Sequence, residues 1–376
     1  MTNVLNYARC AFAAGTRADA QHAARDQETK GRTVTLQPKF RLAAASLLAL
    51  CAASPALSAE VNIYTTREPG LIQPILDAFT ASTGVTVNTV YLQEGMPERV
   101  EAEGESSPAD ILMTVDFGAL IDLVNRGLTQ PVSSEVLEAA IPEAQRDAEG
   151  NWFGLTGRAR VVYLANDIEL DEITYEDLAD ERWRGKLCIR SGHHPYNTAM
   201  IANFIAHHGE EEAQAWLEGI KANQARPAAG GDRDGARDIA AGICDIAVAN
   251  SYYVGLMRSG RGGPEQEEWG KAFKVLLPTF ADGGTQVNIS GAAVAKHAPN
   301  RAEAVQLLEY LVSDEAQKLY AEANFEHPVT DGAEVHPIIA EFGELTPDET
   351  PLTEIVTHRA LASELVDRVN FDTFEN

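Results

Sequence analysis

The chain has 376 residues, of which 45% are hydrophobic and 23% are charged, and its formal net charge is −26. This length exceeds what one ordinary compact core fills, so two lobes are expected, and the composition is that of a globular protein. Proteins that bind nucleic acid usually present a basic face, and the strongly acidic balance argues against that class.

The N-terminal region has the pattern of a secretory signal peptide. Lys39 and Arg41 precede an apolar run over residues 42–53, and small residues follow near position 58. This order predicts export, with residues 1–59 forming an N-terminal extension and a signal peptide that is removed. No later stretch is apolar enough to cross a bilayer, so the mature chain is expected to contain no membrane span.

Two cysteines, Cys188 and Cys244, remain after the signal peptide. A pair of cysteines in an exported protein favours a disulfide, and two buried free thiols are the alternative. Neither cysteine has the CxxC or Cys/His neighbours that a zinc site needs.

Short apolar runs alternate with helical patterns along the rest of the chain. The expected strands cover residues 61–64, 85–92, 109–115, 186–190, 244–249, 274–280 and 288–295. The expected helices cover residues 69–82, 117–125, 197–208, 210–223, 233–241 and 300–323. This alternation predicts an α/β fold with doubly wound, mostly parallel sheets.

Two α/β lobes account for the pattern better than one. The first lobe is predicted to contain residues 60–157 plus about 285–330, and the second residues 158–284 plus about 331–376. In open α/β sheets the ligand lies beyond the carboxyl ends of the strands, so a cleft between the lobes is the expected binding site.

Three tyrosines follow the ends of two predicted strands. Tyr252 and Tyr253 come directly after the strand at 244–249, and Tyr196 holds the matching place after the strand at 186–190. Phenols have a pKa of about 10, but a trivalent cation displaces their protons and binds the hard phenolate oxygens. Packing at the start of a helix is the alternative role for such a pair.

From Val61 to about Val329 the chain resembles the periplasmic ferric-iron-binding proteins of ABC importers, a branch of the type II periplasmic binding fold. The stretches that carry the resemblance are VNIYTTREPGLIQPILDAF (61–79), SPADILMTVDFGALIDLVNRGL (107–128), GRARVVY (157–163), WRGKLCIRSGHHPYN (183–197), ARPAAGGDRDGARDIAAGICDIAVANSYYVG (225–255) and VNISGAAVAK (287–296). The PYN and SYY segments match the iron-tyrosine motifs of that family, so the resemblance implies that Tyr196, Tyr252 and Tyr253 are iron ligands.

The resemblance also implies an anion site. Some members place His or Tyr ligands after the first strand, but Glu68 and Pro69 follow Arg67 here. The chain is closer to members that use three tyrosines and a carbonate-like anion held by arginines, which match Arg67 and Arg158, with Arg160 as the alternative register. A guanidinium offers the planar pair of donors that carbonate or bicarbonate needs.

Each of these residues also has a structural alternative. Arg67 could instead pair with Glu68 or Asp116, and Arg160 with a surface carboxylate. Glu68 could bind iron, orient Arg67, or be exposed without a role. His193 and His194 flank Tyr196, but imidazole prefers softer metals, so both are expected at the rim or in solvent.

The overall interpretation is a two-lobe, hinged Venus-flytrap protein of the periplasm. It is expected to be a monomer that carries Fe³⁺ to the inner-membrane permease of an ABC transporter. No GxSxG, P-loop or GxGxxG motif is present, so an enzyme is not expected. The same fold carrying an oxyanion or a small organic acid is the first alternative, and an exported enzyme is the second.

Overall fold

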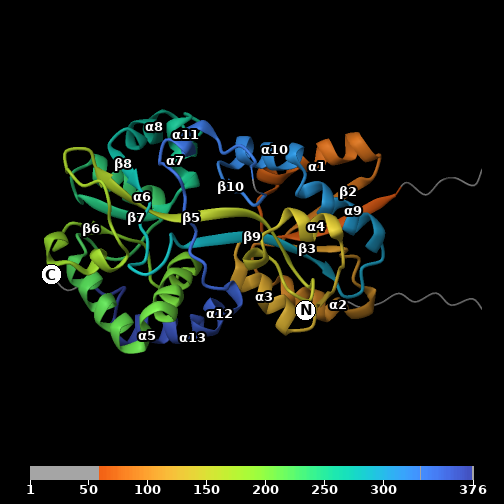
Figure 1. Cartoon of the computed structure of the whole chain (residues 1–376), viewed down its shortest axis with the longest axis horizontal. Coiled ribbons are helices and arrows are strands. Elements are labelled where there is room, and N and C mark those ends of the chain that lie inside the picture. Colours follow the sequence, from red (N-terminus) through yellow and green to blue (C-terminus); the bar gives the residue numbers. More distant parts are fainter. Residues whose placement is uncertain (1–58, 331, 375–376) are drawn as a thin grey trace, which may run out of the picture. The chain divides into compact units, whose positions relative to one another are not determined.

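The structure is a computed structural model that describes residues 59–330 and 332–374. The predicted signal peptide lies outside the described residues. The strands are β1 (Glu60–Thr65), β2 (Thr86–Tyr91), β3 (Ile111–Thr114), β4 (Thr129–Gln130), β5 (Phe153–Ala165), β6 (Leu187–Cys188), β7 (Ile246–Asn250), β8 (Phe273–Leu276), β9 (Val287–Ala295) and β10 (His327–Pro328). The α-helices are α1 (Pro69–Thr83), α2 (Met96–Glu103), α3 (Phe117–Asn125), α4 (Glu135–Ala140), α5 (Pro195–Asn223), α6 (Asp232–Ala240), α7 (Tyr252–Arg258), α8 (Pro264–Gly270), α9 (Arg301–Leu311), α10 (Asp314–Asn324), α11 (Pro337–Ala340), α12 (Leu352–Ile355) and α13 (Arg359–Arg368). Figure 1 shows this alternation of strands and helices, which confirms the α/β class.

The β1–α1–β2 unit follows directly from the sequence pattern. Val61 and Ile63 of β1 are buried, and the apolar residues of α1 recur at helical spacing, so one face of α1 is buried. Gly84 ends α1 with a φ of 75°, a left-handed conformation that glycine adopts without steric cost. β1 pairs in parallel with both β2 and β3, so this part of the sheet has the predicted parallel arrangement.

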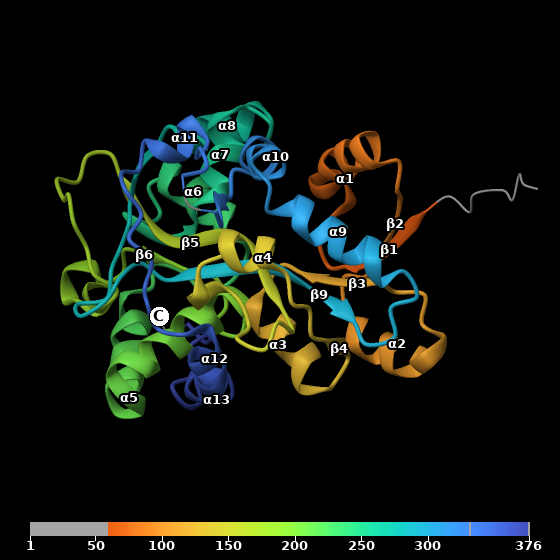
Figure 2. The same ribbon diagram turned by 45° about the vertical axis from the view of Figure 1, so that its right-hand side comes forward.

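β5 and β9 are the longest strands, and they connect the two ends of the sheet. β9 pairs antiparallel with β3 and with the first half of β5, while the second half of β5 pairs antiparallel with β7. Figures 1 and 2 show β5 and β9 running side by side between β3 and β7. The expectation of a mostly parallel sheet is therefore wrong, because an apolar pattern identifies a strand but not the direction of its neighbour.

Two predicted helical regions have different outcomes. The two helices expected at 197–208 and 210–223 are confirmed, because α5 consists of two helical segments that meet at a kink, the non-helical Gly209 with φ 80° and ψ 178°. The single helix expected at 300–323 is instead two helices, α9 and α10. The Ser313 hydroxyl accepts a hydrogen bond from the Ala316 amide and caps α10, so the chain starts a new helix there.

Different apolar clusters pack against the two ends of β5. Phe153 and Leu155 join the core formed with α1, α9 and α10, whereas Val161 and Tyr163 join the core formed with α6 and α7. The C-terminal helix α13 packs on α5, as Figure 2 shows. The lobe boundaries at residues 157/158 and 284/285 stay a prediction.

Candidate functional site

Tyr252 and Tyr253 open α7 immediately after β7. All five residues of β7 are buried, and Val254 and Met257 anchor the inner face of α7, so the start of this helix is held at the end of the strand. The two tyrosine rings lie 4.1 Å apart between centroids, and both side chains are partly exposed. Adjacent helical residues differ by about 100° around the axis, yet both rings line one cavity.

Tyr196 reaches the same place from α5. β6 lies parallel to β7, so the helices that follow both strands start at the same edge of the sheet. The His194 ring caps α5 by accepting a hydrogen bond from the Tyr196 amide at 3.2 Å. The Tyr196 and Tyr252 hydroxyl oxygens are 3.4 Å apart. The structure therefore brings the three predicted tyrosines together.

The tyrosines line a cavity of about 430 Å³ whose walls come from both ends of the sheet. Its lining residues are Thr66, Arg67, Glu68, Leu71, Tyr91, Val115, Arg158, Tyr196, Arg233, Tyr252, Tyr253, Leu256, Ala323, Asn324, Phe325 and Glu326. Burial raises the pKa of Tyr252 well above its usual range, and Tyr253 and Tyr196 add to the rise while Arg158 opposes it. Burial, followed by Asp232, also raises the pKa of Tyr253. A cation entering here must therefore displace phenolic protons.

Arg67 and Arg158 lie in this cavity wall, and both bind one buried carboxylate, Glu326. Arg67 donates to the two Glu326 oxygens at 3.1 and 2.9 Å and to the Ser290 hydroxyl at 2.7 Å. Arg158 donates to Glu326 through Nε at 2.9 Å and Nη2 at 2.8 Å, and to the Val115 carbonyl at 2.7 Å. The alternative that Arg67 pairs with Glu68 or Asp116 is therefore wrong, because its carboxylate partner is Glu326 from a distant part of the chain.

Glu326 is held as an anion by this arrangement. Burial alone would raise its pKa, but Arg158 and then Arg67 outweigh that effect and bring the pKa down to about 2. Its second oxygen also accepts a hydrogen bond from the Thr156 hydroxyl at 2.5 Å. We call Arg67, Arg158 and Glu326 the guanidinium–carboxylate cluster; two cations and one anion leave it a net charge of +1.

Arg160 belongs to a second buried cluster and does not line the tyrosine cavity. Its guanidinium donates to Asp232 at 2.7 Å and to Asn250 at 3.0 Å, and Arg190 donates to the other Asp232 oxygen at 3.1 Å. The partner of Arg160 is therefore a fully buried carboxylate rather than a surface one. Asp232 also accepts from the Asn250 amide, so this cluster fixes the end of β7 just before the tyrosine pair.

The other residues singled out in the sequence lie in or near the cavity, at the start of α5, or in a disulfide. Glu68 is exposed and lines the cavity. His193 is exposed and contacts Asp367 at 3.0 Å, and His194 caps α5, so neither ring lines the cavity. Cys188 and Cys244 form the predicted disulfide, which joins the end of β6 to the residues before β7.

Sequence reasoning missed Glu326, Asp232 and Arg233. Arg233 is exposed on the cavity wall, with its guanidinium 5.6 Å from the centre of the Tyr253 ring. Glu326 lies 259 positions from Arg67, and no spacing rule reports a contact at that separation.

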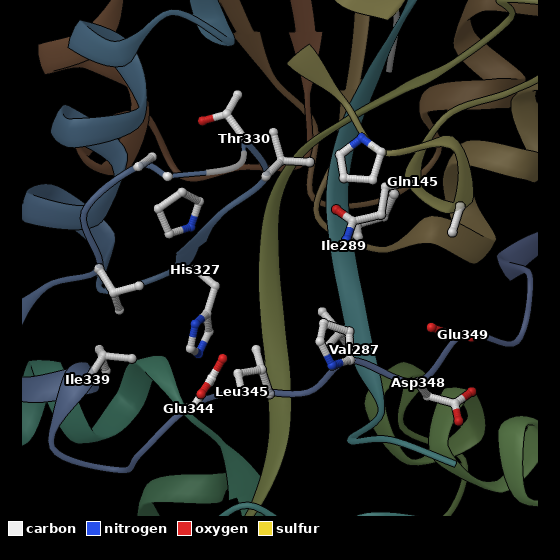
Figure 3. Close-up of a pocket in the computed structure, with 18 of the residues that line it drawn as sticks. Gln145, Val287, Ile289, His327, Thr330, Ile339, Glu344, Leu345, Asp348 and Glu349 are labelled. Atoms are coloured by element: carbon white, nitrogen blue, oxygen red, sulfur yellow. The ribbon is translucent and has the colours of Figure 1, made fainter. Parts of the chain in front are cut away.

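A larger cavity of about 910 Å³ lies elsewhere, against β9 and β10. Figure 3 shows Val287, Ile289, His327, Glu344 and Glu349 around this cavity, with Glu344 drawn beside His327 and Glu349 on the opposite side. The described residues that line it include no tyrosine, arginine or lysine. It therefore lacks both the phenols and the guanidinium groups that make the smaller cavity suited to a hard cation and an anion.

Residues 59–330 and 332–374 contain no group of three or more His, Cys, Asp or Glu side chains arranged to hold a metal ion. No helix among the same residues has the length and apolar character needed to cross a membrane.

Comparison with known proteins identifies the class. Residues 106–341 match the family of bacterial extracellular solute-binding proteins, so the chain belongs to that family. It has their two-lobe, type II periplasmic-binding-protein fold with a hinge and an interlobe cleft, as predicted. It is accordingly a substrate-binding protein and not an enzyme.

Within the family of solute-binding proteins, this chain is similar to several iron-binding members. Iron uptake proteins A1 and A2 of Synechocystis sp. are 37% and 40% identical, over 85% and 84% of this chain and 89% and 91% of their own length. The Bordetella ferric binding protein is 58% identical with a TM-score of 0.81, and the alignment covers 84% of this chain and all of that one. A Trichodesmium protein in complex with iron and citrate ligands is 39% identical with a TM-score of 0.79, over 83% and 99% of the two chains. The predicted resemblance to ferric-iron-binding proteins is confirmed.

Proposed function

We propose that this protein binds Fe³⁺ in the 430 Å³ cavity through the phenolates of Tyr196, Tyr252 and Tyr253. The observation that carries the proposal is the convergence of three phenols on one partly buried point, with two hydroxyl oxygens 3.4 Å apart. Three phenolates balance the charge of one Fe³⁺ ion, and their hard oxygens suit a hard trivalent cation. The names of the relatives, iron uptake and ferric binding proteins, support the same cargo.

A synergistic anion, carbonate or bicarbonate, completes the iron coordination in this proposal. Arg158 supports this role because its guanidinium lies 5.4 Å from the centre of the Tyr252 ring, beside the phenols. Arg67 lines the same wall. The guanidinium–carboxylate cluster retains a net charge of +1, which favours an anion next to the metal.

The cycle we propose is export to the periplasm, capture of iron, closure of the lobes and delivery to an ABC permease. The family match supports a permease as the partner, and the names of relatives support the compartment. Closure must be driven by contacts that exist only in the closed state, and an anion that reaches both iron and arginines supplies such contacts. We propose that the protein acts as a monomer.

A second candidate cargo is an oxyanion or small organic acid. The observation in its favour is that three arginines, Arg67, Arg158 and Arg233, line the cavity. In that case the tyrosines are cavity walls, and binding requires no metal.

Ligand-dependent thermal stability separates the two cargoes. A ligand at a hundred times its Kd stabilises the native state by about 2.7 kcal/mol. We expect ferric citrate in bicarbonate buffer to raise the Tm, and phosphate, oxalate or citrate without iron to have little effect at the same concentration. A rise with an anion alone, unchanged by added iron, would move the cargo to the organic-acid or oxyanion class.

A further inference from the structure

The two arginines assigned to the anion are already paired with a carboxylate from the protein itself. Glu326 is 3% exposed, and its oxygens receive hydrogen bonds from Arg67, Arg158 and Thr156. An exogenous anion on these arginines therefore meets a fixed negative charge that contacts the same guanidinium groups. This contact distinguishes the site from a pair of free arginines.

The donors that remain define where a guest anion can bind. Each guanidinium has five N–H groups, and the contacts described above engage three of them on Arg67 and three on Arg158. The described residues provide no acceptor for the other two on each side chain. A small anion can use these without displacing Glu326, because both side chains line the cavity that the tyrosines also line.

Charge then determines which anion is favoured. With Glu326 ionised, the cluster presents a net charge of +1, whereas the two arginines alone would present +2. Coulombic attraction scales with the product of the charges, so a carboxylate at this position weakens the binding of a dianion more than the binding of a monoanion. Screening is limited at this site because Arg67 and Glu326 are nearly fully buried.

We propose that Glu326 is a specificity-determining residue that limits the synergistic anion to one of low charge, such as bicarbonate. This inference rests on the proposed function for its biological meaning, but the anion preference is a property of the iron-free protein as well. Glu326 also positions the site, because it holds Arg158 beside the Tyr252 ring. The ligand class is thus a small, planar carboxylate or carbonate of charge −1, in preference to polycarboxylates and phosphate.

The test is a series of anions of increasing charge on iron-free protein. Titration calorimetry with bicarbonate, oxalate and citrate would compare the wild type with Glu326→Gln. We expect the substitution to raise the affinity for bicarbonate about tenfold and the affinity for oxalate about a hundredfold. Each negative charge of the anion is then no longer opposed by the charge of Glu326. Oxalate added to the iron-loaded protein, followed by visible absorption, would report whether the same preference applies beside the metal.

Two controls separate specificity from folding. Glu322→Gln makes the same substitution on α10, at a side chain that is 57% exposed, and is expected to leave every anion affinity unchanged. Glu326→Asp keeps the charge, and the ratio of oxalate to bicarbonate affinity should stay near that of the wild type. An equal change for all anions in Glu326→Gln, or weaker binding of oxalate, would overturn the proposal. Because the calorimetric titrations contain no iron, their result stands even if the protein fails to bind Fe³⁺.

Discussion

Asp232→Asn tests how the tyrosine pair is held in place. Asp232 is fully buried and accepts from Arg160 at 2.7 Å, from Arg190 at 3.1 Å and from the Asn250 amide at 2.9 Å. Arg160 is itself 1% exposed, so the substitution leaves a buried guanidinium without its counter-charge. Breaking a buried ion pair in this way typically costs about 3–5 kcal/mol. We therefore expect a loss of at least about 3 kcal/mol in the free energy of unfolding.

Urea and thermal unfolding of the same samples measure this loss. For a chain of this size each kcal/mol lowers the Tm by about 2 °C, so the expected shift is about 6–10 °C. Asp234→Asn is the matched control on α6, because its carboxylate is partly exposed and its main contacts are the Gly231 amide and Arg237. That variant should lose about 1 kcal/mol or less. An Asp232→Asn protein as stable as the control would refute the reasoning.

Three further predictions concern other parts of the fold. Replacing both Cys188 and Cys244 with Ala should lower the free energy of unfolding by up to about 4 kcal/mol, because the disulfide closes a loop with a sequence separation of 56. Urea unfolding would measure this loss. An unchanged free energy of unfolding would show that the disulfide does not constrain the unfolded chain. Burial lowers the pKa of His327 to about 4 in the folded state against about 6.5 when unfolded, so only the unfolded chain gains a proton between these values. Stability should therefore fall by about 3 kcal/mol as the pH drops from 6.5 to 4, and His327→Asn should show a shallower decline in pH-dependent unfolding; an identical slope would contradict the assignment. Gly255→Ala should destabilise the protein by about 1–3 kcal/mol and weaken iron binding, because an added Cβ would lie 2.2 Å from the Phe325 ring. A Gly255→Ala protein with the stability and iron affinity of the wild type would show that α7 accommodates the methyl group.

Much of the fold was predictable from local pattern. Helix α1 begins at Pro69 and ends before Gly84, and both boundaries follow from the conformational preferences of these residues. The break between α9 and α10 was missed because the apolar periodicity continues across Ser313, and only its capping hydrogen bond reveals the new start. Strand β5 was not among the predicted strands, and its antiparallel pairing with β9 was missed with it, because strand direction depends on the tertiary fold.

The site was predictable to the extent that it depends on strand ends. Tyr196 and Tyr252 follow neighbouring parallel strands, so their proximity was implied by position. The partners of the arginines were not predictable, because Glu326 lies 259 positions from Arg67 in the sequence and Asp232 lies 72 positions from Arg160. An acidic residue looks the same in the sequence whether it is exposed or buried, and only the folded structure shows which carboxylates are buried.

A visible absorption titration of the mature protein with ferric citrate in bicarbonate buffer tests whether the tyrosines of the cavity hold Fe³⁺. The wild type should develop a broad phenolate-to-iron band that stops growing at one equivalent. Tyr310→Phe, which changes a tyrosine that packs on Phe79 and does not line the cavity, should behave identically. Tyr252→Phe should lose much of the band and of the iron affinity. A wild type without a band, or a Tyr252→Phe protein with the full band, would contradict the assignment of this cavity as a tyrosinate site for Fe³⁺.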